Sequence, residues 1–492
     1  MLLMEDRLLE HLKELTASNW LIDYPSKILG DASCKGKARR NQELYQLTLK
    51  QLQLLVASTA KAQVRLKVFL IENDPIQFSA SFLAAIIAKT DLFICDPNWR
   101  EQEWQQVFNL VQPDLILADA ETETLVAKIR LKQNKYEQDV VENAEGYLGE
   151  KPLIMIPTGG TSGKVRFAIH TWSTLTASVT GFGEYFKLKT INSFCILPLY
   201  HVSGLMQFMR SLITKGNLLI LPYRVIKEAR VTIPSHNYFI SLVPTQLQFL
   251  IEFDPLWLAN FKTVLLGGAP ASRSLLNRAR KYNIPLAPTY GMTETAAQVV
   301  TLKPEDFLRG NNSSGQVLPH AQVKIINDQN LAQEQQTGLI SISSRSLCLG
   351  YYPQMFNQDQ SFNTDDLGWF DAQGYLHLVG RNSHKIITGG ENVFPVEVEA
   401  AILETQLVKD VCVIGLADAQ WGQVVTALYI PGQANLDLAV IKQKLQPQLA
   451  KYKHPKNWLQ VNSLPRNNRG KINYQELKAI AKQLLDKSAK NS

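Results

Sequence analysis

Glycines and hydroxyl residues alternate over residues 158–164, Thr-Gly-Gly-Thr-Ser-Gly-Lys. Glycines allow backbone N–H groups to come close to a ligand, and the hydroxyls add donors, so this stretch can wrap a polyphosphate. It departs from a Walker loop, which needs Gly and Ser or Thr where this chain has Thr158 and Val165. Apolar runs at 153–156 and 165–169 predict a turn between two strands. Taken alone, the stretch is equally typical of a structural glycine-rich turn.

A second group of residues that could take part in binding or catalysis lies at 290–294, Tyr-Gly-Met-Thr-Glu. It follows the turn 267–270, Gly-Gly-Ala-Pro. Tyr290 can stack on a purine, Thr293 can reach a phosphate, and Glu294 can ligate Mg²⁺, which prefers hard oxygen ligands. Taken alone, these residues fit better with a loop in which Thr293 caps a helix and Glu294 lies in its first turn.

Two charged motifs follow. Asp366, in Thr-Asp-Asp-Leu-Gly at 364–368, and Arg381 could together hold the two hydroxyls of a ribose, although a turn acid and a surface ion pair explain them equally well. Lys471, in Pro-Arg-Asn-Asn-Arg-Gly-Lys-Ile at 465–472, could neutralise charge on a transferring phosphoryl group. A single lysine is more often simply exposed to solvent.

The order of these motifs narrows the interpretation. They occur at 158–164, 198–204, 267–270, 290–294, 364–368, 380–392 and 465–472. In sequence and spacing they resemble the core motifs of the acyl-adenylate-forming superfamily, which contains acyl-CoA synthetases, adenylation domains and firefly-type luciferases. The resemblance covers roughly residues 150–475.

The resemblance implies a role for each motif. The implied ATP-binding residues are Thr158, Gly159, Gly160, Thr161, Ser162, Gly163, Arg166, Gly267, Gly268, Ala269, Tyr290, Asp366 and Arg381. Thr293 and Glu294 would serve phosphate and Mg²⁺, and Lys471 would be the adenylation lysine. The implied chemistry is attack of a carboxylate on the α-phosphorus of ATP, in which positioning and charge neutralisation supply most of the catalysis. A small domain would then rotate about 381–384 and present a face around Gly389 and Gly390 to a thiol, expected to be coenzyme A.

The chain departs from the family pattern in two places. Aligned back from His170-Thr171, the phosphate loop has Arg166 where the family has lysine; arginine keeps the charge but is a planar fork. The same alignment puts Gly159, Val165 and Phe167 where the family has Ser, Pro and Gly. The hinge position, commonly Asp or Lys, is Ser383. Because Glu294, Asp366 and Lys471 are retained, we expect an active enzyme.

The stretches 198–210 and 241–247 most resemble the o-succinylbenzoate–CoA ligases of menaquinone and phylloquinone synthesis. That resemblance implies that Arg210, nine residues after His201, binds the substrate's carboxylates, with His201 and Ser241 as further substrate-binding residues. The implication is physically reasonable, because an aromatic diacid needs a cation for the carboxylate that does not react. Arg210 as a surface helix residue and His201 as an ordinary core histidine remain open.

Other functions are compatible with the motifs. These are an acyl-CoA synthetase for aryl or fatty acids, a free-standing adenylation enzyme that loads a carrier protein, a luciferase-type oxygenase, and a non-catalytic binding protein.

The elements that must position these residues alternate between predicted strands and predicted helices. Apolar runs at 66–71 and 91–95 predict strands, with a helix at 77–88 between them, which favours a parallel sheet. The expected fold is α/β, with a large N-terminal domain of stacked α/β sheets plus a β-rich subdomain over 1–380. A small α+β domain, 384–492, follows on a hinge at about 381–384.

Composition bounds the possibilities further. The chain has 492 residues, of which 45% are hydrophobic and 19% charged, typical of a globular protein. Its net charge of +7 is scattered, except for the cluster 35–40, which we interpret as a solvated basic loop, so nucleic acid is not an expected partner. The five cysteines form no C-x-x-C pair, and no apolar run reaches the roughly 18 residues of a membrane helix. We expect a cytoplasmic monomer or homodimer whose partners are a small carboxylic acid, ATP and CoA.

Overall fold

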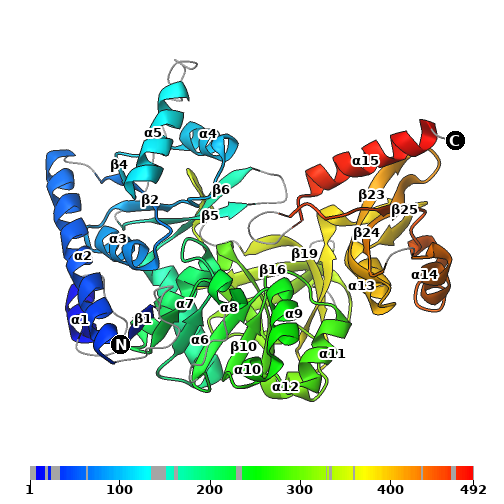
Figure 1. The fold of residues 1–492 in the computed structure, drawn as a ribbon, viewed down its shortest axis with the longest axis horizontal. Helices are drawn as coiled ribbons and strands as arrows, with labels where there is room; N and C mark the ends of the chain where they lie inside the picture. Colours follow the sequence, from blue (N-terminus) through cyan, green and yellow to red (C-terminus); the bar gives the residue numbers. More distant parts are fainter. Residues whose placement is uncertain are drawn as a thin grey trace.

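The computed structural model describes most of the chain. The described residues are 7–16, 20–23, 34–62, 65–133, 151–159, 164–228, 235–327, 330–331, 335–357, 361–433, 436–466 and 472–490. They form a large N-terminal part and a smaller C-terminal part that lies to one side of it (Figure 1).

The first layer is a seven-stranded sheet in the order β18-β17-β6-β5-β3-β2-β4. Its strands are β2 (Lys67–Ile71), β3 (Asp91–Ile94), β4 (Leu115–Ala118), β5 (Ile154–Gly159), β6 (Val165–His170), β17 (Gly350–Tyr351) and β18 (Gln354–Met355). Strands β4, β2, β3 and β5 are parallel. The run Val68–Ile71 is buried throughout, because helices cover both faces of the sheet.

The second layer is an eight-stranded sheet in the order β1-β8-β7-β9-β10-β11-β12-β13. Its strands are β1 (Leu21–Asp23), β7 (Asn192–Cys195), β8 (Leu218–Ile220), β9 (Tyr238–Leu242), β10 (Thr263–Leu266), β11 (Leu286–Met292), β12 (Ala297–Thr301) and β13 (Gln316–Val317). The strands run parallel from β1 to β11, and β12 and β13 are antiparallel.

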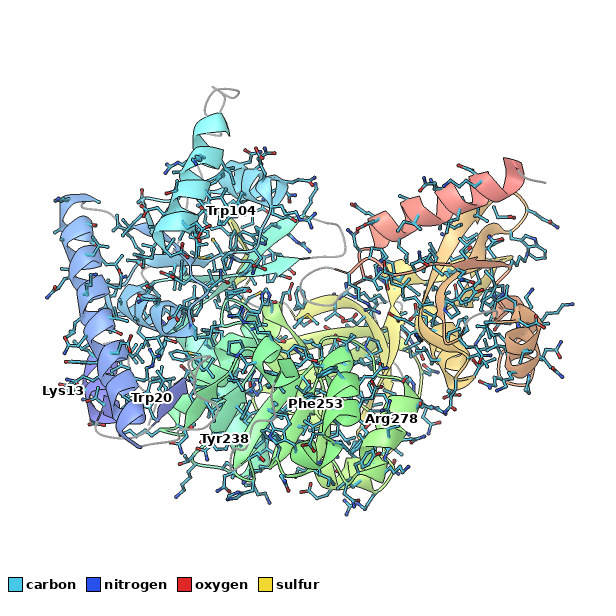
Figure 2. All side chains as sticks on the ribbon, in the orientation of Figure 1. Lys13, Trp20, Trp104, Tyr238, Phe253 and Arg278 are labelled. Carbon is cyan, nitrogen blue, oxygen red and sulfur yellow. The ribbon has the colours of Figure 1, made fainter. Side chains whose placement is uncertain are left out.

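Helices fill the space between the sheets and cover their outer faces. They are α1 (Leu8–Thr16), α2 (Cys34–Ala62), α3 (Pro75–Ile87), α4 (Glu101–Leu110), α5 (Ala120–Gln133), α6 (Trp172–Phe186), α7 (Val202–Ile213), α8 (Tyr223–Glu228), α9 (Pro244–Phe253), α10 (Pro255–Ala259), α11 (Arg273–Lys281) and α12 (Pro304–Leu308). One apolar core joins α3, α6 and α7 to both sheets. Trp104 of α4 is buried on the outer face of the first sheet (Figure 2). The result is a stack of alternating helical and sheet layers.

Helix α3 shows how local sequence starts these elements. Asp74 precedes it in an extended conformation, and its side chain accepts hydrogen bonds from the backbone N–H groups of Ile76 and Gln77. Pro75 occupies the first turn, where its missing N–H costs nothing.

A β-rich sheet follows, in the order β15-β14-β16-β19-β20. Its strands are β14 (Ala321–Asn327), β15 (Asn330–Leu331), β16 (Gly338–Ser344), β19 (Phe362–Phe370) and β20 (Leu376–Arg381). Its core packs against Tyr290, Val299 and Val300 of the second sheet.

The C-terminal part is one sheet with helices on both faces. Its elements are β21 (Ile386–Thr388), β22 (Glu391–Val393), α13 (Pro395–Glu404), β23 (Val408–Asp418), β24 (Gly422–Pro431), α14 (Leu438–Leu445), β25 (Asn457–Gln460) and α15 (Tyr474–Lys490). Helices α13 and α14 pack on one face and α15 on the other, as Figure 1 shows for α15. The predicted fold class is confirmed.

The interpretation of residues 35–40 as a basic loop is wrong, because they lie in helix α2. Residues 34–62 contain no proline and one glycine, and most of the others are good helix formers. Helix propensity here outweighs the clustering of positive charge.

Glu399 on α13 makes the stability of the C-terminal part depend on pH. Its Oε1 accepts a hydrogen bond from Val413 N at 2.8 Å, and burial raises the pKa of Glu399 to about 7. A pKa above the unfolded value means that the neutral carboxyl stabilises the fold below about pH 4.5, and that this contribution is lost as pH rises through 7.

We therefore expect Glu399→Gln to be more stable than the wild type at pH 8, by about 1–3 kcal/mol, and equally stable at pH 4.5. Native-state hydrogen exchange of residues 395–431 at a series of pH values measures this difference. Glu397→Gln, on the same helix, removes an exposed ion pair with Lys453 at 2.6 Å but should keep the pH slope of the wild type. A pH slope in Glu399→Gln equal to that of the wild type would contradict the assignment.

Candidate functional site

Strands β5 and β6 carry the residues that flank the glycine-rich loop. They are antiparallel, with Thr158 opposite Arg166 and Gly159 opposite Val165. The two strands predicted to flank the loop are confirmed. Gly160, Thr161, Ser162 and Gly163 lie outside the described residues.

Glu294 lies in a 3₁₀ turn, η2 (Thr293–Thr295), which joins β11 to β12. The residue is 7% exposed, and its Oε1 accepts hydrogen bonds from Tyr351 Oη at 2.7 Å and Thr158 Oγ1 at 3.4 Å. The alternative of a helix capped by Thr293 is wrong, since Ala296 adopts a left-handed conformation, φ 49°, and β12 begins at the next residue. A carboxylate next to a phosphate-type loop fits Mg²⁺, which is commonly bound by one or two carboxylates together with substrate phosphates.

Tyr351 connects Glu294 to Arg166. Its ring lies under the Arg166 guanidinium, with 4.5 Å from Cζ to the ring centre, and β17 pairs with β6 at Ala168. Burial and then the Glu294 charge raise the pKa of Tyr351, so its hydroxyl stays protonated and donates. Tyr351 is not among the residues predicted from the sequence, because its only local signal is its position after Gly350.

His170 supports the turn from beneath. It is fully buried; one ring nitrogen, Nε2, lies 2.8 Å from Thr293 O and the other, Nδ1, 3.0 Å from Thr174 Oγ1. Burial lowers the pKa of His170 to about 4, so the ring is neutral at physiological pH. Its contact with the Thr293 carbonyl ties the Glu294 turn to strand β6.

Asp366 and Arg381 face each other across β19 and β20. Arg381 Nε lies 3.2 Å from Asp366 Oδ1, and Tyr290 Oη donates to Asp366 Oδ2 at 2.9 Å. Burial is the main reason that the pKa of Tyr290 is raised. Three predicted ATP-binding residues thus meet in one group, in an arrangement that could hold two vicinal hydroxyls.

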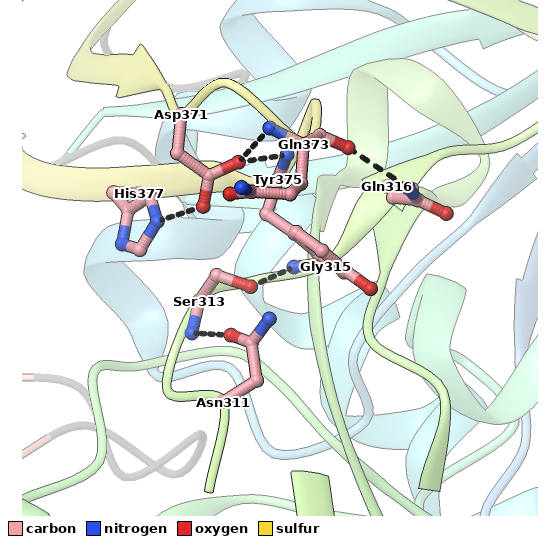
Figure 3. Close-up of polar contacts among 8 residues, drawn as sticks. All are labelled: Asn311, Ser313, Gly315, Gln316, Asp371, Gln373, Tyr375 and His377. Atoms are coloured by element: carbon pink, nitrogen blue, oxygen red, sulfur yellow. Dashed lines mark hydrogen bonds and ion pairs between the residues drawn. The ribbon is translucent and has the colours of Figure 1, made fainter. Parts of the chain in front are cut away.

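The turn at the other end of β19 and β20 is held by one carboxylate. Asp371 accepts hydrogen bonds from Gln373 N at 3.1 Å, Tyr375 N at 2.9 Å and His377, whose Nε2 is 2.9 Å away (Figure 3). This closed turn fixes the register that places Asp366 opposite Arg381.

The predicted hinge is a single 3₁₀ turn, η3 (Asn382–His384). Ser383 N donates to Asp365 Oδ1 at 3.0 Å, and the Ser383 hydroxyl also bonds the Asp365 carboxylate. The His384 ring lies 4.1 Å from the ring of Tyr474, at the start of α15. Lys471 lies outside the described residues.

The predicted ATP-binding residues Gly267, Gly268 and Ala269 follow β10, and the predicted substrate-binding residue Ser241 lies near the end of β9. Gly267 and Gly268 follow β10; a Cβ at Gly267 would lie 2.6 Å from Thr289 Oγ1, and Gly268 has φ 83°. Ala269 is the next residue, and Ser241 is opposite Leu265 in the β9–β10 pair. The glycines after β10 lie one strand from Tyr290 on β11, and Ser241 on β9 lies two strands from it.

Gly389 and Gly390 form the tight turn between β21 and β22, with φ of 59° and 86°. Gly389 N donates to Trp421 O at 2.9 Å, and a Cβ there would lie 2.8 Å from the Trp421 ring. The described contacts of this turn are within the C-terminal part, so its role toward CoA stays a prediction.

His201 precedes helix α7 at the edge of the site. Its Nε2 lies 3.8 Å from Asp96 Oδ2, and its ring packs against Tyr200 at 4.7 Å between centres. Tyr200 in turn accepts a hydrogen bond from Asn98 at 2.8 Å. His201 is therefore held by the loop after β3.

Arg210 lies in the last turn of α7 and is 3% exposed, so its interpretation as a surface residue is wrong. Its Nη2 donates to Gln298 Oε1 at 2.7 Å, and its guanidinium stacks on Phe182, 4.2 Å from the ring centre. Burial lowers the pKa of Arg210, although a guanidinium remains cationic at neutral pH. No described Asp or Glu forms an ion pair with it. A buried cation without a counter-ion is costly and favours an anionic ligand.

The structure thus brings the predicted residues into three groups. Thr158, Arg166 and Glu294 suit a metal-bound phosphate, Tyr290, Asp366 and Arg381 suit a ribose, and Arg210 suits a carboxylate. Among the described residues, no group of three or more His, Cys, Asp or Glu could hold a metal ion. No helix in those same ranges is long and apolar enough to cross a bilayer.

Comparison with protein families matches residues 42–352 to the AMP-binding enzyme model and residues 397–471 to the AMP-binding enzyme C-terminal domain. A 2-succinylbenzoate–CoA ligase of Listeria innocua is 31% identical over 94% of this chain and 99% of its own length. A 2-succinylbenzoate–CoA ligase of Enterococcus faecalis is 37% identical over 64% of this chain and 67% of its own.

Solved structures share the fold. An o-succinylbenzoate CoA synthetase from Bacillus subtilis, in complex with the acyl-adenylate intermediate, has a TM-score of 0.78 and 24% identity, covering 96% of this chain and 98% of its own. The ATP-bound MatB from Rhodopseudomonas palustris has a TM-score of 0.79 and 22% identity. The match covers 97% of this chain and 99% of that protein.

Proposed function

Because the chain belongs to the AMP-binding enzyme family, we propose that it is an ATP-dependent acid–CoA ligase that converts 2-succinylbenzoate, ATP and CoA to 2-succinylbenzoyl-CoA, AMP and diphosphate. This reaction belongs to menaquinone or phylloquinone synthesis. It needs ATP, Mg²⁺ and CoA.

One observation carries the choice of acid. Arg210 is a buried cation whose described polar partner is the neutral amide of Gln298. A pocket for a fatty acid has no need of such a charge, whereas a diacid has one carboxylate left over when the other reacts. Relatives that carry the name 2-succinylbenzoate–CoA ligase support the same choice.

The first half-reaction follows from the site. The reacting carboxylate attacks the α-phosphorus of ATP in line and diphosphate leaves. Asp366 and Arg381 would hold the ribose, Thr158, Gly159–Gly163 and Arg166 would hold the phosphates, and Thr293, Glu294 and Lys471 would act at the reacting phosphate. Mg²⁺ held at Glu294 would offset the charge on the phosphates.

The second half-reaction transfers the acyl group to the CoA thiol. We assign residues 1–380 to the AMP-binding domain and 384–492 to a mobile C-terminal domain, which would rotate about 381–384 and bring Gly389 and Gly390 toward the adenylate. The contact of Ser383 with Asp365, which links the hinge to the N-terminal part, would change in this rotation. The enzyme is proposed to act in the cytoplasm as a monomer or homodimer.

A panel of acids tests the proposal. Purified protein with ATP, Mg²⁺ and CoA should release AMP much faster with 2-succinylbenzoate than with acetate, medium-chain fatty acids or coumarate. Thioester should form on CoA and not on a carrier protein. Lys471→Ala should lose ATP–pyrophosphate exchange, which distinguishes an enzyme from a binding protein.

Equal or faster turnover of the monoacids would overturn the choice of acid, and transfer only to a carrier protein would overturn the choice of acceptor.

A further inference from the structure

A group of buried polar side chains surrounds Arg210. Gln298 reaches it from β12, and Phe182 of α6 lies under its guanidinium. His320, in the segment between β13 and β14, lies against Gly181, the neighbour of Phe182. His320 is also close enough for the positive charge of Arg210 to act on it. The sequence reading identified neither Gln298 nor His320.

Several nitrogens of this group have no hydrogen-bond partner within the described residues. They are Arg210 Nε, Gln298 Nε2 and both ring nitrogens of His320. The three residues are 3%, 7% and 3% exposed. More than about 90% of buried polar groups in proteins are hydrogen-bonded to protein or to ordered water, so four unsatisfied atoms in neighbouring residues mark a place where a polar ligand can bind.

The position of the His320 ring is imposed by its surroundings. A Cβ at Gly181 would lie only 1.9 Å from His320 Nδ1, so any larger residue at 181 would displace the ring. The backbone is held as well, since His320 O accepts hydrogen bonds from Ser344 Oγ at 3.1 Å and Arg345 N at 3.2 Å. The ring is therefore fixed without any described hydrogen bond of its own.

The unsatisfied groups are mostly donors. Arginine can only donate, the amide nitrogen of glutamine donates, and a neutral histidine ring provides one N–H. Burial, followed by the charges of Arg345 and Arg210, lowers the pKa of His320 to about 4, so the ring is neutral. Unsatisfied donors beside one buried cation match a ligand that only accepts, and an ionised carboxylate is such a ligand.

We infer that His320 and Gln298 are specificity-determining residues that, together with Arg210, bind the carboxylate of the acid that does not react. The inference rests on the proposed function, since it assumes a diacid substrate for this site. It adds that the choice between a diacid and a monoacid depends on three side chains from three separate elements.

Two substitutions test the inference with two acids. His320→Leu removes both ring nitrogens at similar volume, and Gln298→Glu puts a carboxylate 2.7 Å from Arg210, where it would replace the substrate's. The acids are 2-succinylbenzoate and 4-oxo-4-phenylbutanoate, which is the same molecule without the ring carboxylate.

We expect His320→Leu to raise KM for the diacid by about 10-fold or more, the loss of one hydrogen bond to a charged group, and Gln298→Glu by about 100-fold. Because the monoacid lacks the carboxylate that these residues bind, its KM should rise much less than that of the diacid, so the ratio of kcat/KM for diacid to monoacid should fall by about 10-fold or more in both variants. His320→Asn, which keeps an N–H donor, should recover part of the diacid KM. His11→Leu is a matched control, because His11 is also buried and its ring bonds Leu212 O at 2.8 Å; it should lower Tm without changing the ratio of the two acids.

Unchanged ratios of diacid to monoacid in both variants would overturn the inference. The proposed substrate can fail separately. If the wild type prefers another diacid and both variants lose that preference, the role of His320 and Gln298 is supported and the choice of 2-succinylbenzoate as the substrate is contradicted. If the wild type prefers an acid without a second anionic group, the carboxylate-binding role of these residues is contradicted, but the protein can still be an acid–CoA ligase.

Discussion

Replacing Glu294 by glutamine should lower the rate of ATP–pyrophosphate exchange by about 10²–10³-fold, the loss typical of one charge-stabilising group in an active site. Glutamine keeps the shape of the side chain and an acceptor for Tyr351 and Thr158, so the turn at 293–295 should stay folded. The negative charge that would hold Mg²⁺ is lost. Titration of the exchange rate with Mg²⁺ should show a raised apparent Kd for the metal.

Two variants sharpen this experiment. Glu305→Gln, an exposed glutamate on α12, should behave as the wild type. Tyr351→Phe removes the 2.7 Å hydrogen bond but leaves the Glu294 charge, so its loss should be smaller, about 10–100-fold, as for other groups that orient a metal ligand. If Glu294→Gln stays within a few-fold of the wild type, Glu294 is not the metal ligand.

The sequence was sufficient where local patterns decide the structure. The apolar runs at 66–71 and 91–95 became β2 and β3, and the amphipathic stretch 395–404 became α13, because burial of one apolar run or face is a short-range signal. Asp366 and Arg381 could also be paired from sequence, since they belong to adjacent strands joined by a short turn.

The environment of each site residue could not be predicted in the same way. Tyr351 reaches Glu294 only because β17 is added to the edge of β6, far from it in sequence. Gln298 meets Arg210 because β12 lies against α6 and α7, and His320 is brought near this pair because the β13–β14 segment lies against α6 at Gly181. Contacts of this kind depend on the order of strands in the sheets, and no local pattern encodes them.

The role of Arg166 shows the same limit. In the sequence, Arg166 replaces the lysine of the family. The two side chains are not equivalent, because the guanidinium is planar and the lysine ammonium is a compact point charge. In the structure its flat guanidinium stacks on Tyr351, a contact that a lysine ammonium would not make over the same area. The arginine is thus matched to the tyrosine that orients Glu294.

Arg210→Met should produce opposite changes in substrate binding and in stability. Methionine preserves the length of the side chain and its packing on Phe182 but removes the charge. KM for 2-succinylbenzoate should rise by about 10–150-fold, since a hydrogen bond to a charged group contributes roughly 1.5–3 kcal/mol. The kcat at saturating diacid should change little, because the lost interaction is made with the carboxylate that does not react and is therefore equal in ground and transition states.

The free protein, in contrast, should be as stable as the wild type or more so. In the wild type a buried cation faces only a neutral amide and an aromatic ring among the described residues, and desolvation of that charge opposes folding. Thermal melting without ligand should therefore give a Tm equal to or above the wild-type value, while the rise in Tm on adding the diacid should be smaller than in the wild type. A variant that loses stability and keeps its KM would show that Arg210 is a structural residue, because its charge would then be needed for the fold and not for the acid.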